Sequence, residues 1–156
     1  MTNNIKTKII ETQNKWAEGV VAIGGLMNNM DECKKAAKDF IKEMYAYEFT
    51  TVIFKPTKAA EIQFRGTPES ALSYFVGSNP NYSEDNGFAL APWKKIVFDN
   101  QGFIIDYDML CASGNYYFTD SYDNTIKVEY TMGFIKDKNG KLKINLHHSS
   151  LPYSPQ

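Results

Sequence analysis

The first third of the chain repeats its apolar residues at spacings of three and four, which is the period of an amphipathic helix. One stripe runs from Ile9 to Met27 and predicts a long helix that Gly24 and Gly25 close. A second helix is expected after Asp31, which can cap its first turn. The apolar stripe of this second helix consists of Cys33, Ala37, Phe40, Ile41 and Met44.

A third, shorter helix is marked at both ends. Thr67 is suited to the N-cap, Pro68 to the first helical position, and Gly77 to the position after the last turn. Glu69 adds a negative charge to the first turn, where the helix dipole favours it. The buried side of this helix is expected to contain Ala71, Leu72 and Phe75.

The rest of the chain alternates apolar and polar residues, which is typical of half-buried strands. Strands are expected at residues 50–54, 61–64, 92–99, 103–106, 110–120, 125–137 and 142–149. Turn sequences separate the later ones: "DNQG" at 99–102, "SYDN" at 121–124 and "KDKNG" at 136–140. Helices first and an antiparallel sheet afterwards predict an α+β fold, and no boundary divides the single domain expected over residues 1–156.

Alternation along the last two strands predicts which side chains face inward, because adjacent strand residues point to opposite sides of a sheet. The expected inner set is Val128, Tyr130, Met132 and Phe134, followed by Leu142, Ile144, Leu146 and His148. His147 would then lie on the outer face, so the two histidines of the chain are not expected to bind one metal ion together.

Charge and composition exclude several classes of partner. The net charge is −1 and the lysines are dispersed, so no basic stripe suits nucleic acid. Arg65 is the only arginine, which disfavours phosphate recognition. No apolar run reaches transmembrane length, so no membrane partner is expected. Cys33 and Cys111 lie on apolar stripes and are expected to be free thiols, which favours a reducing compartment. The first residues show no apolar leader, so the cytoplasm is the expected location, and a removed leader peptide is the alternative.

The order of elements and the terminal "HHSSLPY" resemble the nuclear transport factor 2-like (cystatin-like) superfamily. More narrowly, they are similar to bacterial stand-alone proteins that resemble the association domain of calcium/calmodulin-dependent protein kinase II. The segments "FKPTKA", "FRGTPESALSYFVG", "GFALAPW", "GNYYFTD" and "VEYTMGF" carry the same likeness. The resemblance implies a cone whose curved sheet wraps around an internal pocket beneath the helices. No kinase domain accompanies this module, so a kinase partner is not implied.

In the kinase association domains that this chain resembles, the internal pocket is lined by arginines. The matching positions here are Gly114, Met132 and His148, so an anion pocket of that type is not expected. The implied lining is aromatic and mostly apolar, which suits a small apolar or aromatic molecule. The expected pocket residues are Tyr74, Trp93, Tyr116, Phe118, Tyr130, Met132, Phe134, His148 and Ser150.

Several kinds of chemistry were weighed for this pocket. A zinc hydrolase needs three protein ligands, which the chain does not assemble, so no metal and no cofactor is expected. His148 is the candidate for cofactor-free acid–base catalysis, because imidazole titrates near neutral pH. Asp106 and Asp108 are carboxylate candidates, although a solvated turn is the simpler interpretation. Arg65 is either an anion clamp at a helix start or, preferably, the partner of Glu61 or Glu69 in a salt bridge.

The leading hypothesis is a small-molecule-binding or oligomeric assembly module of unknown ligand, with enzymatic activity uncertain. The alternative is a cofactor-free acid–base enzyme of the isomerase, dehydratase or cyclase type that uses a pocket histidine. A homodimer or larger assembly is expected through a mixed polar and aromatic patch on the outer sheet face. That patch consists of Asn115, Tyr117, Glu129, Thr131, Asn145 and His147.

Overall fold

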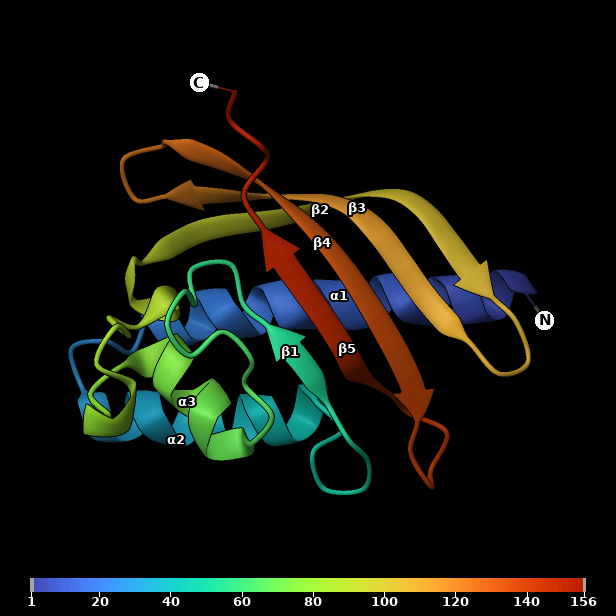
Figure 1. Cartoon of the computed structure of the whole chain (residues 1–156), viewed down its shortest axis with the longest axis horizontal. Coiled ribbons are helices and arrows are strands. Elements are labelled where there is room, and N and C mark those ends of the chain that lie inside the picture. The colour runs from blue at the N-terminus through green and yellow to red at the C-terminus, as the bar shows by residue number, and fades with distance from the viewer. Residues whose placement is uncertain (1, 156) are drawn as a thin grey trace.

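The computed structural model describes residues 2–155 and shows helices packed against one face of a long, curved sheet (Figure 1). The helices are α1 (Thr2–Gly24), α2 (Met30–Met44), α3 (Pro68–Val76) and the short 3-10 helices η1 (Pro80–Tyr82) and η2 (Phe88–Leu90). The strands are β1 (Ile53–Lys55), β2 (Trp93–Ile105), β3 (Leu110–Asp120), β4 (Thr125–Lys136) and β5 (Leu142–Ser150), in the sheet order β1-β5-β4-β3-β2. The α+β cone expected from the sequence is confirmed.

The helix boundaries follow the local capping signals. Thr67 and Ser70 form a reciprocal capping box at the start of α3, with Pro68 at the first position and Gly77 at the end. The predicted cap of α2 was wrong by two residues. The Asn29 side chain, rather than that of Asp31, accepts the backbone N–H of Glu32.

Three expectations for the sheet were also wrong. Residues 99–102 form no hairpin turn, because β2 runs unbroken through them with a register shift between Asn100 and Gly102. Residues 61–64 form no strand; they belong to an irregular segment after β1. The sheet is mixed rather than purely antiparallel, since the short β1 pairs in parallel with β5.

A β-bulge interrupts the pairing of β4 with β5. Gly133 pairs with Leu146 and Phe134 with Ile144, which leaves Asn145 without a partner on β4. The extra residue reverses the alternation of β5 at that point. Leu142 and Ile144 face inward before the bulge, and after it the inward positions are odd-numbered.

The core lies between the concave face of the sheet and the helices. It is unusually aromatic, and Trp16 of α1 stands at its centre against rings from α2, α3 and three strands. Cys33 and Cys111 are both free and buried. Within residues 2–155, no helix is both long and apolar enough to cross a membrane.

Candidate functional site

A small polar-ended cavity lies where the end of β1, α3 and the end of β5 meet. Its free volume is about 10 Å³, close to the space that one water molecule needs. Most of its wall is aromatic, and its hydroxyl groups come from the loop after β1, from β3 and from β5. The lining residues are Trp16, Phe54, Pro56, Thr57, Tyr74, Phe75, Phe88, Tyr116, His147 and Ser149.

A chain of hydrogen bonds runs from α1 to this cavity. Trp16 Nε1 donates to Tyr45 Oη at 3.0 Å, and Tyr45 Oη lies 2.8 Å from His147 Nδ1. The other ring nitrogen, His147 Nε2, lies 3.1 Å from Tyr116 Oη. Tyr116 then donates to Ser149 Oγ at 2.6 Å.

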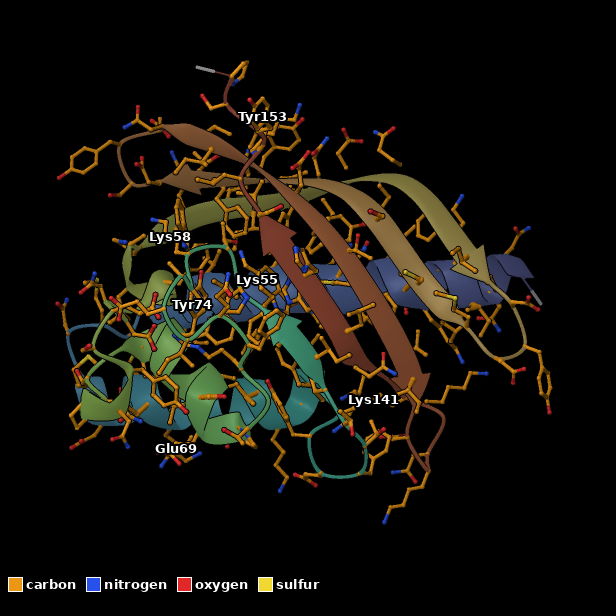
Figure 2. The ribbon with its side chains drawn as sticks, in the orientation of Figure 1. Lys55, Lys58, Glu69, Tyr74, Lys141 and Tyr153 are labelled. Atoms are coloured by element: carbon orange, nitrogen blue, oxygen red, sulfur yellow. The ribbon has the colours of Figure 1, made fainter. Side chains whose placement is uncertain are left out.

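Ser149 connects this chain to the loop that follows β1. Ser149 Oγ lies 2.6 Å from Thr57 Oγ1, and the Ser149 carbonyl accepts a hydrogen bond from Lys55 Nζ at 3.0 Å. Thr57 is half-buried, whereas Ser149 and Tyr116 are buried. The chain therefore begins deep in the core and ends at the more accessible side of the cavity. Lys55, Lys58 and Tyr74 lie around this end on β1, the following loop and α3 (Figure 2).

The donors of this chain all point the same way. The Trp16 indole can only donate, so the Tyr45 hydroxyl accepts from it and has its own proton free for His147 Nδ1. A neutral imidazole that accepts at Nδ1 carries its proton on Nε2, where it donates to Tyr116. Tyr116 donates its own proton to Ser149 Oγ, so the serine hydroxyl is free to donate to Thr57 or to a molecule in the cavity.

Burial keeps every member of the chain uncharged at neutral pH. Desolvation lowers the pKa of His147 from 6.5 to about 3, with a smaller contribution from the charge of neighbouring His148. Burial raises the pKa of Tyr45 and that of Tyr116 well above the ordinary value for tyrosine. The site is thus a neutral network that can both donate and accept protons, with no ionised group of its own.

The sequence-based assignment of the two histidines is wrong, because it carried a regular alternation through the bulge at Asn145. His147 is 1% exposed and belongs to the cavity, whereas His148 is exposed on the outer face of the sheet. Ser150 likewise lies on the outer side, and Ser149 takes the inner position. The two imidazoles do lie on opposite sides of the sheet.

The other expected pocket residues divide between the cavity and the packed core. Tyr74 and Tyr116 line the cavity. Phe118, Met132 and Phe134 are buried core residues, and Trp93 lies beside a neighbouring surface pocket. Tyr130 belongs to a separate cluster in which its hydroxyl pairs with Gln13 of α1 and Asn100 of β2.

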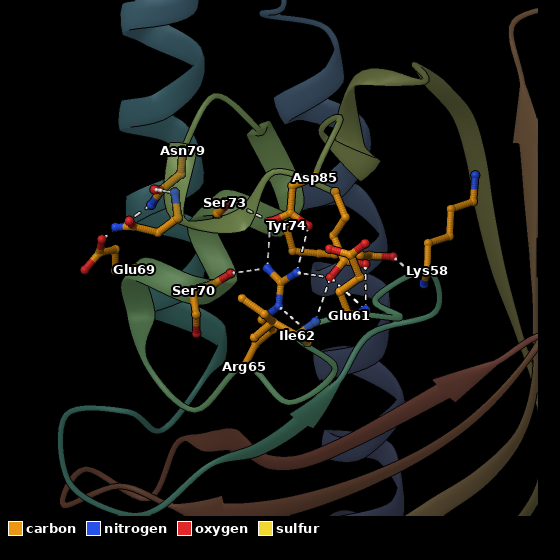
Figure 3. Close-up of polar contacts among 12 residues, drawn as sticks. Lys58, Glu61, Ile62, Arg65, Glu69, Ser70, Ser73, Tyr74, Asn79 and Asp85 are labelled. Carbon is orange, nitrogen blue, oxygen red and sulfur yellow. Dashed lines mark hydrogen bonds and ion pairs between the residues drawn. The ribbon is translucent and has the colours of Figure 1, made fainter.

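Arg65 anchors the loop that carries Thr57 (Figure 3). Its guanidinium is fully buried and forms two hydrogen bonds of 2.7 Å with the Asp85 carboxylate. Glu84, 3.8 Å from Arg65, accepts backbone N–H groups from residues 60–62. A salt bridge was the preferred interpretation, but neither Glu61 nor Glu69 is the partner.

One member of the expected patch, His147, is not on the outer face of the sheet. His148 and Ser150 lie on that face instead, beside Asn115, Glu129 and Thr131. Assembly through this face stays a prediction. Asp106 and Asp108 lie in the exposed turn between β2 and β3, away from the cavity lining.

Sequence reasoning missed Thr57, Tyr45 and Ser149. Thr57 follows Pro56 in the loop after β1 and carries no periodic signal. Tyr45 follows α2 directly, where it was outside the expected apolar stripe. Among residues 2–155, no group of three or more His, Cys, Asp or Glu side chains is placed to hold a metal ion.

Comparison with solved structures first defines the fold class. The chain resembles a calcium/calmodulin-dependent protein kinase II association domain from Xanthomonas campestris, with a TM-score of 0.59, 21% identity, and coverage of 99% of this chain and 90% of the other. It also resembles a nuclear transport factor 2-like protein from Salmonella enterica serovar Typhimurium, with a TM-score of 0.55, 12% identity, and coverage of 100% and 96%. These likenesses establish a nuclear transport factor 2-like fold.

Closer relatives then identify the family. Residues 7–151 match the family model for metal-independent carbonic anhydrase. A metal-independent carbonic anhydrase from Nostoc sp. (strain PCC 7120 / SAG 25.82 / UTEX 2576) is 38% identical over 151 residues, 95% of this chain and 74% of the relative. The crystal structure of a cyanobacterial iota-carbonic anhydrase complexed with bicarbonate has a TM-score of 0.91 at 37% identity, over 96% of this chain and 93% of the other. The chain belongs to the metal-independent carbonic anhydrase family.

Family membership corrects the leading functional hypothesis. A binding or assembly module of unknown ligand is wrong, because the matching family and relatives are enzymes. The alternative of a cofactor-free acid–base enzyme agrees better with these relatives. The histidine named for it, His148, lies on the outer face of the sheet, and His147 is the one that lines the cavity.

Proposed function

We propose that this protein catalyses the reversible hydration of carbon dioxide to bicarbonate without a metal ion. The observation that carries the proposal is the neutral chain from Trp16 to Ser149, which ends in hydroxyl groups at a cavity sized for a very small molecule. Family membership supports it, and so does the relative of 0.91 TM-score whose structure contains bicarbonate.

The reaction needs a proton acceptor for the attacking water and a proton donor for the oxygen that gains charge. A single hydroxyl group can supply both functions, since it carries one donor proton and two acceptor lone pairs. Ser149 and Thr57 carry the aliphatic hydroxyls at the cavity, and Tyr74 and Tyr116 carry the phenolic ones. His147 is a weak base with its pKa near 3, so it is better suited to orienting Tyr116 than to holding the water's proton.

In the proposed step, the water oxygen forms a bond to the carbon of CO2. The water passes one proton to the hydroxyl oxygen of Ser149 or Thr57, and that hydroxyl passes its own proton to a CO2 oxygen. The exchange produces carbonic acid, which ionises to bicarbonate and a proton, and returns the hydroxyl unchanged. When the Ser149 proton moves to CO2 ahead of the proton arriving from water, negative charge develops on Ser149 Oγ, and Tyr116, which donates to that oxygen at 2.6 Å, would stabilise it.

The apolar wall suits the other reactant. Phe54, Phe75 and Phe88 line the cavity together with the hydroxyl groups. CO2 has no net charge and no hydrogen-bond donor, so apolar rings can hold it without a desolvation cost. Excluding bulk water also strengthens the hydrogen bonds at the polar end.

Stopped-flow measurement of proton release tests the proposal. Protein treated with a chelator should hydrate CO2 faster than buffer does, with the same rate before and after treatment. Ser149→Ala should lower kcat/KM about 100-fold or more, because it removes the shuttling hydroxyl. Tyr116→Phe should lower kcat by about tenfold or more while keeping the ring packing.

Ser150→Ala is the matched control, since it removes the same hydroxyl from the next residue on the opposite face. It should keep kcat/KM near that of the unsubstituted protein. Absence of catalysis in folded, chelator-treated protein would refute the proposed function. Equal losses in Ser149→Ala and Ser150→Ala would refute the proposed site.

A further inference from the structure

The catalytic cavity shares a wall with a much larger surface pocket. This outer pocket has a volume of about 470 Å³ and is lined by Lys58, Tyr74, Glu84, Asp85, Asn86, Gly87, Phe88, Leu90, Ala91 and Trp93. Tyr74 and Phe88 line both spaces, so these two rings separate the outer pocket from the hydroxyl groups. Their planes are stacked at 19° with centroids 5.4 Å apart.

We infer that substrate and product exchange through this outer pocket, with the Phe88 side chain as the movable partition and Lys58 as the residue that attracts bicarbonate at its mouth. The inference rests on the proposed function. It is needed because the cavity, at about 10 Å³, has the space of about one water molecule and cannot hold CO2 beside a water, or bicarbonate, unless a wall residue moves.

Phe88 is the wall residue best able to move. Tyr74 is held on α3, is 5% exposed, and accepts the backbone N–H of Lys58 through its hydroxyl at 3.2 Å. Phe88 is half-buried in the three-residue helix η2, and its ring packs against Tyr74, Trp93 and Phe118 without a hydrogen bond that would fix its orientation. Its backbone carbonyl accepts a 2.8 Å hydrogen bond from Trp93 Nε1, so the ring can rotate on an anchored backbone.

The charges around the outer pocket leave one cation available. Asp85 is occupied by Arg65, and Glu84 by three backbone N–H groups as well as Arg65. The exposed Lys58 ammonium forms no ion pair with any residue of the described chain and lies 5.9 Å from the Phe88 ring centroid. Its side chain extends away from the carboxylates (Figure 3). Lys58 is therefore placed to attract an anion next to the partition.

A groove between α2 and α3 is the rival route. It has a volume of about 480 Å³ and reaches Tyr45, whose hydroxyl belongs to the hydrogen-bond chain. Passage there would require Tyr45, which is 1% exposed, to break its bonds to Trp16 and His147. Rotation of Phe88 breaks no hydrogen bond of its side chain, so the outer pocket is the easier route.

Site-directed blocking distinguishes the two routes. Asn86→Cys places an exposed thiol at the outer pocket, and Glu69→Cys places one at the rival groove. Both native cysteines are buried, so a bulky methanethiosulfonate reagent should leave the unsubstituted protein unmodified and active. Labelling Asn86→Cys should lower kcat/KM for CO2 hydration about tenfold or more relative to the same variant before labelling, and reduction should restore it.

Labelled Glu69→Cys should retain its activity. Loss of activity on labelling Glu69→Cys alone would overturn the inference in favour of the rival groove, and full activity of both labelled variants would overturn it altogether. These outcomes are separate from failure of the proposed function, which would appear as no catalysis in unlabelled protein.

A charge variant provides a second test that does not depend on the introduced thiols. Lys58→Glu should raise the inhibition constant of bicarbonate about threefold to tenfold at low ionic strength, and added salt should reduce the effect. Lys38→Glu is the matched control, because it reverses an exposed charge at the rival groove. An unchanged inhibition constant in Lys58→Glu would refute the role of Lys58.

Discussion

Acid should destabilise this protein through His147. The imidazole is 1% exposed, and its pKa falls from 6.5 to about 3 on folding. The unfolded chain therefore binds a proton at this position more readily than the folded chain, over the range between these two values. Stability contributed by the neutral imidazole is complete above pH 6.5 and is lost as the pH falls toward 3.

The size of the effect follows from the two pKa values. Each pKa unit between the folded and unfolded states corresponds to about 1.4 kcal/mol. At pH 5, about 1.5 units below the unfolded value, His147 should reduce the free energy of unfolding by about 2 kcal/mol relative to pH 7.5. The loss would reach about 4 to 5 kcal/mol near pH 3, a large fraction of the stability of an ordinary domain.

Urea denaturation at pH 7.5 and at pH 5 measures this difference. His147→Gln keeps hydrogen-bonding atoms near Tyr45 and Tyr116 but cannot titrate, so its stability should fall less between the two pH values, by about 2 kcal/mol. His148→Gln removes the adjacent, exposed imidazole and should keep most of the pH dependence, because burial is the larger cause of the lowered pKa of His147. An NMR titration of His147 that gave a pKa near 6.5, or equal pH dependence in His147→Gln and the unsubstituted protein, would refute the argument.

Two further predictions concern the buried Arg65–Asp85 pair and the outer face of the sheet. Asp85→Asn should lower the free energy of unfolding by about 3 to 5 kcal/mol, because it leaves the fully buried Arg65 guanidinium without its closest carboxylate. Asp39→Asn, at an exposed pair with Lys35, should cost less than about 1 kcal/mol, and an equal cost in both variants, measured by urea denaturation, would contradict the argument. If the protein assembles through the outer sheet face, light scattering at micromolar concentration should give at least a dimer, and Glu129→Lys should shift it toward monomer. A monomer mass for the unsubstituted protein would rule out that assembly.

Helices and the outline of the sheet could be predicted because each depends on local patterns. The stripe from Cys33 to Met44 and the Thr67–Pro68 start of α3 are set by residues within a few positions of one another. The parallel partner of β5 could not be predicted in this way. β1 is only three residues long, and its pairing with β5 joins segments about ninety residues apart.

The candidate site was harder to predict because one inserted residue decides it. Nothing in "KINLHHSS" shows that Asn145 would be left unpaired, and Leu146 looks like an inward residue by its apolarity alone. At the bulge, β5 lies so close to β4 that a Cβ added at Gly133 would be 2.9 Å from Leu146 Cβ. Tyr116 and Tyr74 could be predicted because they lie on regular stretches of β3 and α3, away from the bulge in β5.

The Trp16 indole at the start of the hydrogen-bond chain limits the direction in which protons can leave the proposed active site. An indole N–H donates but cannot accept, so the chain cannot reverse its direction and carry a proton into α1. If the protein hydrates CO2 as proposed, a proton released by carbonic acid inside the cavity would depart from the Thr57 end, on the same side as the reactants. Protons, CO2 and bicarbonate would then all pass through one opening. A buffer molecule small enough to reach Thr57 should therefore increase the turnover rate when proton removal limits it.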